Sequence, residues 1–175
     1  MNLSFIALGA NLPSRAGEPA ETLAAAVERL GRVGRIAARS SLYSTAPVGV
    51  ADQPRFLNAA IALETALEPL ELLRTLLQIE LEFGRDRSAG IINGPRTLDL
   101  DLLLYEDRIL DLPELQLPHP RLAERAFVLV PLAEIAASRV EPRSGLTVQE
   151  LLLKYRAAFG KEADAAQILA EGWSE

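Results

Sequence analysis

The sequence predicts an α+β protein of the ferredoxin-like class, in which helices pack on an antiparallel sheet and a helical extension follows at the C-terminus. Over residues 3–105, strand and helix patterns follow one another in the order β-α-β-β-α-β. The 175 residues, 49% of them hydrophobic, can bury one sizeable core, and the absence of cysteine excludes a disulfide framework. We therefore expect a single domain over residues 1–175, with residues 141–175 as an extension of unassigned role.

The strands and helices of the first part follow from apolar spacing and from proline and glycine. Every second residue is strongly apolar over 57–63, which is the period of a strand. Proline suits the first turn of a helix, and glycine often follows its last residue. The predicted elements are strands at 3–8, 36–43, 57–63 and 98–105, and helices from Pro19 to Gly31 and from Pro69 to Gly84.

The second part of the chain begins with a turn at Glu106-Asp107. This turn predicts a short strand at 108–110 that pairs with the strand before it. A proline-rich segment follows, and apolar spacing then predicts helices at 128–136 and 147–159.

Charge and hydropathy exclude several classes of partner. The net charge is −6 and the pI is near 5.0, which argues against a protein that follows a nucleic-acid backbone. No apolar run approaches the roughly 20 residues that cross a bilayer, and no signal peptide is recognisable. We expect a cytoplasmic monomer that acts on small molecules and binds neither nucleic acid nor membrane.

Asp99 and Asp101 form the strongest chemical signal, within the segment Thr97-Leu98-Asp99-Leu100-Asp101-Leu102-Leu103-Leu104. Strand alternation places the leucines at 98, 100, 102 and 104 on one face and both aspartates on the other, roughly 6.5–7 Å apart. An ordinary sheet with one solvated face is the simpler explanation of an isolated pair. However, like charges at neighbouring positions of one face repel each other. A divalent ion bound by carboxylate and phosphate oxygens would relieve that repulsion.

Glu80 interrupts the apolar stripe of the second predicted helix, where its neighbours are Leu73, Leu76, Leu77 and Phe83. A carboxylate in such a place needs a partner. Two explanations stay open from the sequence. Glu80 lies at the edge of the stripe and reaches solvent or an arginine, or the stripe meets a polar pocket in which Glu80 orients a ligand.

Basic residues gather around these carboxylates in loops at the ends of elements, and they are Arg85, Arg87, Arg96, Arg121 and Arg125. Carboxylates that hold a metal beside several guanidinium groups suit phosphoryl transfer, because such enzymes mainly position and neutralise oxygens. The single histidine, His119, lies between Pro118 and Pro120, which hold its backbone. Solvated loop charge and an incidental histidine are the simpler alternatives. The chain contains no Walker A sequence and no G-x-G-x-x-G.

The segment Gly94-Pro95-Arg96-Thr97-Leu98-Asp99-Leu100-Asp101-Leu102-Leu103 closely resembles the signature of the 6-hydroxymethyl-7,8-dihydropterin pyrophosphokinases, a family of folate biosynthesis. Further blocks resemble this family in the same order along the chain, and together they span about residues 3–135. They are Ala7–Asn11, Tyr43–Gly49, Asp52–Pro54, Phe56–Ala59, Ile79–Leu81 with Gly84-Arg85, Pro118–Pro120 and Arg125–Phe127.

The resemblance implies a ferredoxin-like fold and the transfer of pyrophosphate from ATP to the hydroxymethyl oxygen of the pterin, with release of AMP. It implies that Asp99 and Asp101 hold two Mg²⁺ ions that bridge the ATP phosphates, and that Arg85 and Arg96 are catalytic with them. The resemblance assigns the nucleotide and its phosphates to Glu80, Arg85, Arg87, Arg96, His119 and Arg125. It assigns the pterin to Thr45, Val48, Phe56, Asn58 and Phe127.

Two other functions remain open on the residues alone. One is a ferredoxin-like small-molecule binding module without catalysis, and the other is a metal-dependent phosphohydrolase in which water is the nucleophile. ATP binding that depends on Mg²⁺ separates the first of these from a pyrophosphokinase. AMP that forms only when pterin is present separates the second.

Overall fold

The structure is a computed structural model that describes residues 1–47, 49, 52–86, 88, 92, 94–160, 167–170 and 173. The strands of its main sheet are β1 (Asn2–Ala10), β2 (Arg35–Arg39), β3 (Leu42–Thr45), β4 (Phe56–Thr65), β5 (Asp99–Tyr105) and β8 (Gln167–Ala170). The strand order is β5-β1-β4-β3-β8, β2 also pairs with β4, and neighbouring strands are antiparallel. This arrangement confirms the predicted ferredoxin-like class.

The predicted helices of the first part are α1 (Pro19–Leu30) and α2 (Pro69–Glu82). Each begins with a proline, which suits a position where a backbone N–H would lack a helical partner. The residue before each proline is a glutamate whose backbone N–H donates to a glutamate three positions on, Glu21 in α1 and Glu71 in α2. The ends of both helices therefore lie where the sequence predicts them.

The strand predicted at 36–43 is divided into β2 and β3 at Ser40-Ser41. The hydroxyl of Ser40 accepts from the backbone N–H of Ala60 in β4, at 2.9 Å. Ser41 makes different contacts. Its backbone N–H and its hydroxyl both donate to the carboxylate of Glu134. Two serines thus interrupt the predicted strand and join it to α3 (Ala126–Ala136), far along the chain.

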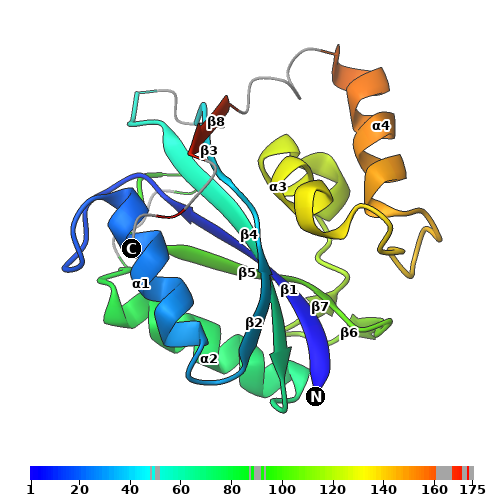
Figure 1. Ribbon diagram of the computed structural model, residues 1–175, viewed down its shortest axis with the longest axis horizontal. Coiled ribbons are helices and arrows are strands. Elements are labelled where there is room, and N and C mark those ends of the chain that lie inside the picture. Colours follow the sequence, from blue (N-terminus) through cyan, green and yellow to red (C-terminus); the bar gives the residue numbers. More distant parts are fainter. Residues whose placement is uncertain are drawn as a thin grey trace.

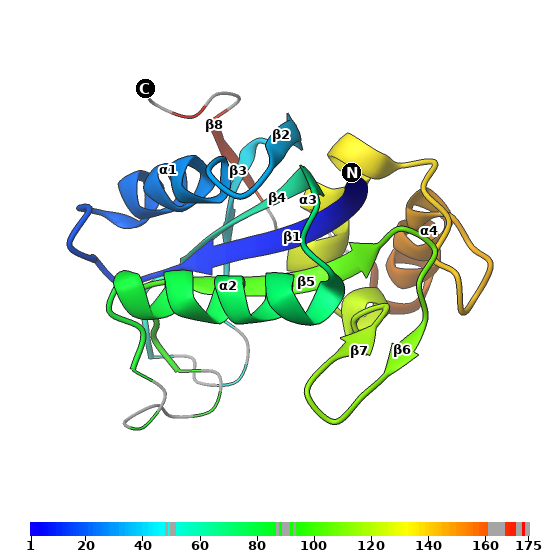
Figure 2. The ribbon, with the colours of Figure 1, turned by 90° about the horizontal axis from the view of Figure 1, so that it is seen from below.

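The second part contains β6 (Leu110–Asp111), β7 (Gln116–Leu117), the 3₁₀ helix η1 (Leu122–Glu124), α3 (Ala126–Ala136) and α4 (Val148–Phe159). Both helices confirm the prediction. The predicted pairing of the short strand was wrong, because β6 pairs with β7 in a separate two-stranded sheet and not with β5. A hairpin partner a few residues along the chain closes a short loop at low entropic cost. Figure 2 shows this hairpin on the same side of the molecule as α4.

The sequence did not predict a strand after α4, yet β8 pairs with β3 at the edge of the main sheet. Farther along the chain, Nε1 of Trp173 donates to the backbone oxygen of Ser40 at 2.9 Å. The guanidinium of Arg39 lies over the indole ring, 5.6 Å from its centroid. The extension is therefore helical over α4, and its residues in β8 and Trp173 contact the sheet.

Helices cover both faces of the sheet (Figure 1). α1 and α2 pack on one face over a core that includes Ile6, Leu8 and Ile61. α3 packs on the other face, and α4 packs against α3 with Val148 and Leu152 buried. None of the helices in the described part of the chain combines the length and apolar character that a bilayer crossing demands.

A β-bulge changes the face of one predicted core residue. The pairing of β1 with β5 shifts between Phe5 and Ile6, since Phe5 pairs with Leu104 and Ile6 with Leu102. Leu104 therefore packs in the core beneath α3, whereas Leu102 stays in the core beneath α1 and α2. The prediction that four alternate leucines share one face was wrong for Leu104 alone, and the bulge leaves the face of Asp99 unchanged.

Candidate active site

Gly9 occupies the centre of a row that runs across three strands. It pairs with Asn58 of β4 on one side and with Asp99 of β5 on the other. Directly paired residues point to the same face, so the side chains of Asn58 and Asp99 share a face, about 10 Å apart over two strand spacings. Asp101 pairs with Ala7, two residues back on β1, and shares this face too. Only small residues of β1 therefore lie between the polar groups of β4 and β5.

The two aspartates have different arginine partners. Asp99 lies 3.0 Å from a guanidinium nitrogen of Arg96 and 3.9 Å from one of Arg85. Asp101 lies 3.8 Å from a guanidinium nitrogen of Arg125. Burial, together with the charge of Asp99, raises the pKa of Asp101 to about 7, and Arg125 only partly opposes this. The face therefore places two carboxylates close together among three arginines, and burial makes the second carboxylate harder to ionise.

Glu80 is buried at the junction of α2 and β5. The residue is 1% exposed, and its Oε1 accepts from the backbone N–H of Leu100 at 3.4 Å. This position excludes the interpretation in which Glu80 reaches solvent. The backbone oxygen of Glu80 also accepts from the N–H of Arg85, and Gly84 at φ 83° makes the turn between them. The end of α2 thus directs Arg85 towards Asp99.

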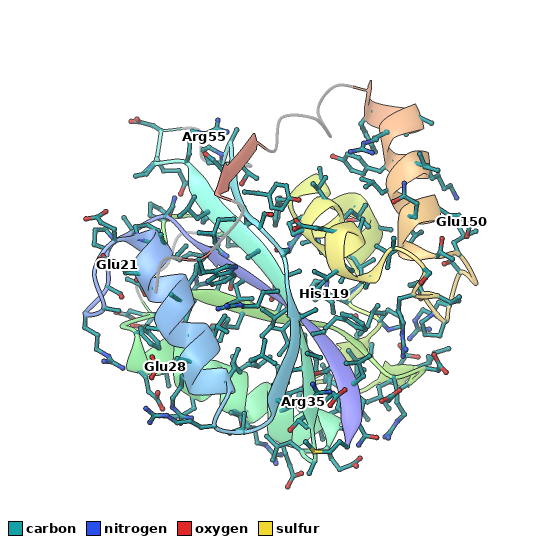
Figure 3. The ribbon with its side chains drawn as sticks, in the orientation of Figure 1. Glu21, Glu28, Arg35, Arg55, His119 and Glu150 are labelled. Atoms are coloured by element: carbon teal, nitrogen blue, oxygen red, sulfur yellow. The ribbon has the colours of Figure 1, made fainter. Side chains whose placement is uncertain are left out.

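His119 is fixed by its backbone and by one ring nitrogen. Its N–H donates to the backbone oxygen of Leu103 at 2.9 Å, and its Nδ1 accepts from the backbone N–H of Arg121 at 3.1 Å. Burial and the nearby charge of Arg125 lower the pKa of His119 to about 4. The ring is therefore neutral at pH 7 with its proton on Nε2, which makes Nε2 a hydrogen-bond donor. Figure 3 labels His119, which lies beside β5.

Arg125 and Phe127 lie at the start of α3. Arg125 is the residue before the helix, and its guanidinium lies over the ring of Phe127, 5.5 Å from the centroid. Burial and the neighbouring Arg121 lower the pKa of Arg125. The start of α3 therefore places Arg125 beside Asp101 and places the ring of Phe127 at the same end of the site.

Three of the predicted pterin residues, Thr45, Phe56 and Asn58, meet where β3 ends and β4 begins. Thr45 pairs with Phe56, and the buried amide of Asn58 donates from Nδ2 to the hydroxyl of Thr45. The guanidinium of Arg96 lies over the ring of Phe56, 5.7 Å from the centroid. This contact joins the pterin residues to the arginines. Val48 and Arg87 lie outside the described residues.

A cavity of about 330 Å³ begins beside His119. It is lined by Asp111, Gln116, Pro118, His119, Pro120, Leu122, Ala123, Glu141 and Arg143. His119 lines this cavity and is also near the charges of Arg125 and Asp99, so it lies at the border between the cavity and the arginine-rich face.

Gly9 and Asn11 were assigned no role from the sequence, although both lie in a block that carries the resemblance. A side-chain carbon added at Gly9 would lie 3.0 Å from Oδ1 of Asn58. Asn11 is 3% exposed and is hydrogen-bonded to Arg96, Gln53 and Pro54. The only signal in the sequence was that Asn11 is a polar residue directly after a buried strand. That signal does not predict hydrogen-bond partners that are so distant in sequence.

Comparison with known proteins identifies the family of the chain. Residues 5–137 match the family described as 7,8-dihydro-6-hydroxymethylpterin-pyrophosphokinase (HPPK). A 2-amino-4-hydroxy-6-hydroxymethyldihydropteridine pyrophosphokinase of Pseudomonas aeruginosa is 48% identical over 150 residues, 85% of this chain and 88% of that protein. The protein of the same name from Bacillus subtilis is 43% identical over 152 residues, 85% of this chain and 87% of the relative.

Solved structures support the fold. The HPPK-DHPS of Plasmodium falciparum, crystallised with pteroate, superposes with a TM-score of 0.70 at 14% identity, over 97% of this chain and 47% of that one. This chain thus spans under half the length of that larger protein. The family match covers most of the chain, and the relatives match over nearly their whole length. The chain belongs to the 7,8-dihydro-6-hydroxymethylpterin pyrophosphokinase family.

Proposed function

We infer that this chain transfers the pyrophosphoryl group of ATP to the hydroxymethyl oxygen of 6-hydroxymethyl-7,8-dihydropterin and releases AMP. The observation that carries this function is the shared sheet face on which Asn58 and Asp99 flank Gly9. The residues proposed to hold a flat ring and the arginine-flanked carboxylates proposed to hold phosphates and metal lie on one sheet face, about two strand spacings apart. Transfer between two bound substrates needs this proximity.

We propose that the pterin binds over the start of β4. Phe56 and Phe127 would hold the flat ring between aromatic faces, and the buried amide of Asn58 would bond to its amide edge. The bond from Asn58 to Thr45 fixes the orientation of that amide. Val48 completes this proposed pocket on the strength of the family resemblance alone.

The ATP phosphates are assigned to the guanidinium groups around the aspartates. Arg85, Arg96 and Arg125 each contact a carboxylate of the site and present planar donors suited to phosphate oxygens. Arg87 belongs to this proposed set by resemblance. In the reaction, the hydroxymethyl oxygen bonds to the β-phosphorus, the bond from that phosphorus to the α–β bridging oxygen breaks, and AMP leaves with that oxygen. The hydroxyl proton passes to solvent.

The residues fit a magnesium site in which ATP phosphates supply part of the metal coordination. Within the described residues no group of three or more acidic, histidine or cysteine side chains could hold a metal alone. Asp99 and Asp101 offer hard oxygen donors on one face. Burial first and the charge of Asp99 second raise the pKa of Asp101, and a bound cation would oppose both effects. Mg²⁺ typically takes one or two carboxylates and fills its other positions with water and phosphate. Bound here, the proposed pair of ions would withdraw charge from the phosphates during transfer.

We propose that the nucleoside end of ATP lies in the cavity beside His119. The Nε2–H of His119 would donate to an oxygen of the nucleotide at the boundary between the cavity and the arginines. Glu80 lies too deep to contact a nucleotide without movement, since it is 1% exposed. Its proposed contribution is to hold β5 at Leu100, between the two aspartates.

We also propose that the chain works as a monomer, because one chain supplies all the described residues of the proposed site. Sedimentation of the protein with and without ATP would test this point. An active dimer whose dissociation abolishes turnover would contradict it.

The function is tested by nucleotide product analysis with ATP, Mg²⁺ and 6-hydroxymethyl-7,8-dihydropterin. The expected result is AMP that appears in step with pterin consumption and is lost in Asp99→Ala. Formation of ADP would indicate a kinase, phosphate without pterin would indicate a hydrolase, and binding without turnover would indicate a binding module.

A further inference from the structure

The side chain of Asn11 joins two loops that approach the end of β1 from opposite sides. Its Oδ1 accepts from the backbone N–H of Arg96 at 2.9 Å. Its Nδ2 donates to Oε1 of Gln53 at 3.0 Å and to the backbone oxygen of Pro54 at 2.9 Å. These bonds reach 85, 42 and 43 residues along the chain. The buried amide of Asn11 thus joins two segments that are distant from it in sequence.

The backbone strengthens the contact on one side. The N–H of Asn11 donates to the backbone oxygen of Arg96 at 3.1 Å, and the N–H of Leu12 donates to the same oxygen at 3.2 Å. Arg96 is therefore fixed to the end of β1 through both its N–H and its oxygen. Its side chain continues from this fixed point to Asp99, 3.0 Å away.

The other side of the amide holds the entrance to β4. Pro54 stands two residues before Phe56 and four before Asn58, and both of these belong to the proposed pterin pocket. The guanidinium of Arg96 lies over the ring of Phe56, the first residue of β4, so a side-chain contact also joins Arg96 to the start of that strand. The amide of Asn11 therefore sets the spacing between a phosphate residue and the pterin residues.

We propose that Asn11 is a positioning residue for pyrophosphoryl transfer. It holds two segments in register: the Arg96 loop, which precedes β5, and the Pro54 loop, which carries Gln53 and Pro54 before β4. In this register the pterin hydroxyl meets the β-phosphorus. This inference rests on the proposed function. Each half of the site keeps its own contacts without Asn11, because Asn58 bonds to Thr45 and Arg96 bonds to Asp99. Loss of the amide should consequently disturb the relation between the substrates more than the binding of either one.

The test compares Asn11→Ala with two narrower changes. Asn11→Asp keeps the shape and the acceptor for Arg96 but removes both donors to the Pro54 loop. Gln53→Ala removes one acceptor of that loop and leaves Asn11 intact. Thr65→Val is the matched control, because Thr65 is fully buried at the far end of β4 and donates to the backbone oxygen of Val33 at 2.7 Å. Each variant is measured for thermal stability, for the dissociation constant of each substrate, and for the single-turnover rate with both substrates saturating.

The expected result is a single-turnover rate that falls on the order of 10²-fold in Asn11→Ala, with both dissociation constants nearly unchanged. Asn11→Asp should show a similar kinetic defect and Gln53→Ala a smaller one, whereas Thr65→Val should lose stability without losing rate. If Asn11→Ala does not fold, Asn11→Asp decides the matter by the same criteria. A rate in the Asn11 variants equal to that of Thr65→Val at matched stability would overturn the proposal. A wild type that forms no AMP would instead overturn the proposed function.

Discussion

Asn58 and Asp99 lie on either side of Gly9 in one row of the sheet, and their side chains share one face. The pairing register of β1 with both neighbours thus determines how far the proposed pterin amide lies from the proposed metal carboxylate. Because Gly9 has no side chain, nothing from β1 rises between these groups. The floor of the site is therefore a property of the sheet and not of the loops above it.

Gly9→Ala is expected to weaken pterin binding more than ATP binding. The new side-chain carbon would lie 3.0 Å from Oδ1 of Asn58, closer than nearly all such contacts, so the amide must shift. We expect the KM for pterin to rise about tenfold, equivalent to about 1.4 kcal/mol, and the KM for ATP to change little. Steady-state kinetics with each substrate varied in turn would measure this.

The control for this substitution is Gly31→Ala, at the end of α1, where the backbone stays in the helical region at φ −59°. It introduces the same methyl group far from the site and should leave both KM values unchanged. Equal effects of the two substitutions, or a larger effect of Gly9→Ala on ATP, would contradict the role assigned to the glycine.

Asp99→Asn and Asp101→Asn are expected to lower kcat on the order of 10²-fold or more, because each removes a charge that would hold Mg²⁺ against the phosphates. Activity in each variant should need higher Mg²⁺ concentrations. Asp107→Asn is the matched control, since the side chain of Asp107 is 87% exposed beyond the end of β5. A magnesium dependence that is the same in the site variants and the control would exclude these carboxylates as ligands.

The two amide substitutions of His119 should differ in their effect on ATP. Glutamine can place an N–H near the position of Nε2, whereas asparagine places one near Nδ1, which accepts from Arg121 in the wild type. We expect His119→Gln to keep most of the ATP affinity and His119→Asn to lose about tenfold. Titration calorimetry with a non-hydrolysable ATP analogue and Mg²⁺ would show the difference. The opposite order would mean that Nδ1 is the functional atom.

His119 should also make the protein less stable in mild acid. Its pKa is lowered from 6.5 to about 4 in the fold, so between these values the unfolded chain binds more protons than the folded one. The stabilisation is complete above pH 6.5 and is lost as the pH falls towards 4. The effect is at most about 3 kcal/mol, and solvent screening reduces it because the ring is only partly buried. Urea unfolding at pH 7 and 4.5 should show a smaller drop for His119→Gln than for the wild type.

Local patterns in the sequence predicted most of the elements and the common face of Asp99 and Asp101. Alternation along a single strand suffices for that face, and proline with glycine suffices for the ends of α1 and α2. The same alternation was wrong at Leu104, because a bulge depends on how two strands pair. The pairing of Gly9 with both Asn58 and Asp99 is a property of the sheet for the same reason.

Long-range contacts explain what the sequence could not predict. The interruption at Ser40-Ser41 depends on Glu134 in α3, and the partner of β6 depends on where the chain turns after it leaves the sheet. Asn11 looks like an ordinary polar residue after a strand until its partners on two loops are known. Each of these features needs residues that are distant in sequence to be placed first.

The central claim is that the β- and γ-phosphorus of ATP move together onto the pterin at the face shared by Asn58 and Asp99. The most direct test uses ATP labelled at the β-phosphorus in one reaction and at the γ-phosphorus in another, with Mg²⁺ and 6-hydroxymethyl-7,8-dihydropterin. The expected result is equal recovery of both labels in the pterin product, with unlabelled AMP, and loss of both in Asp99→Asn. A product that carries only the γ label, or labels released as phosphate, would contradict the account.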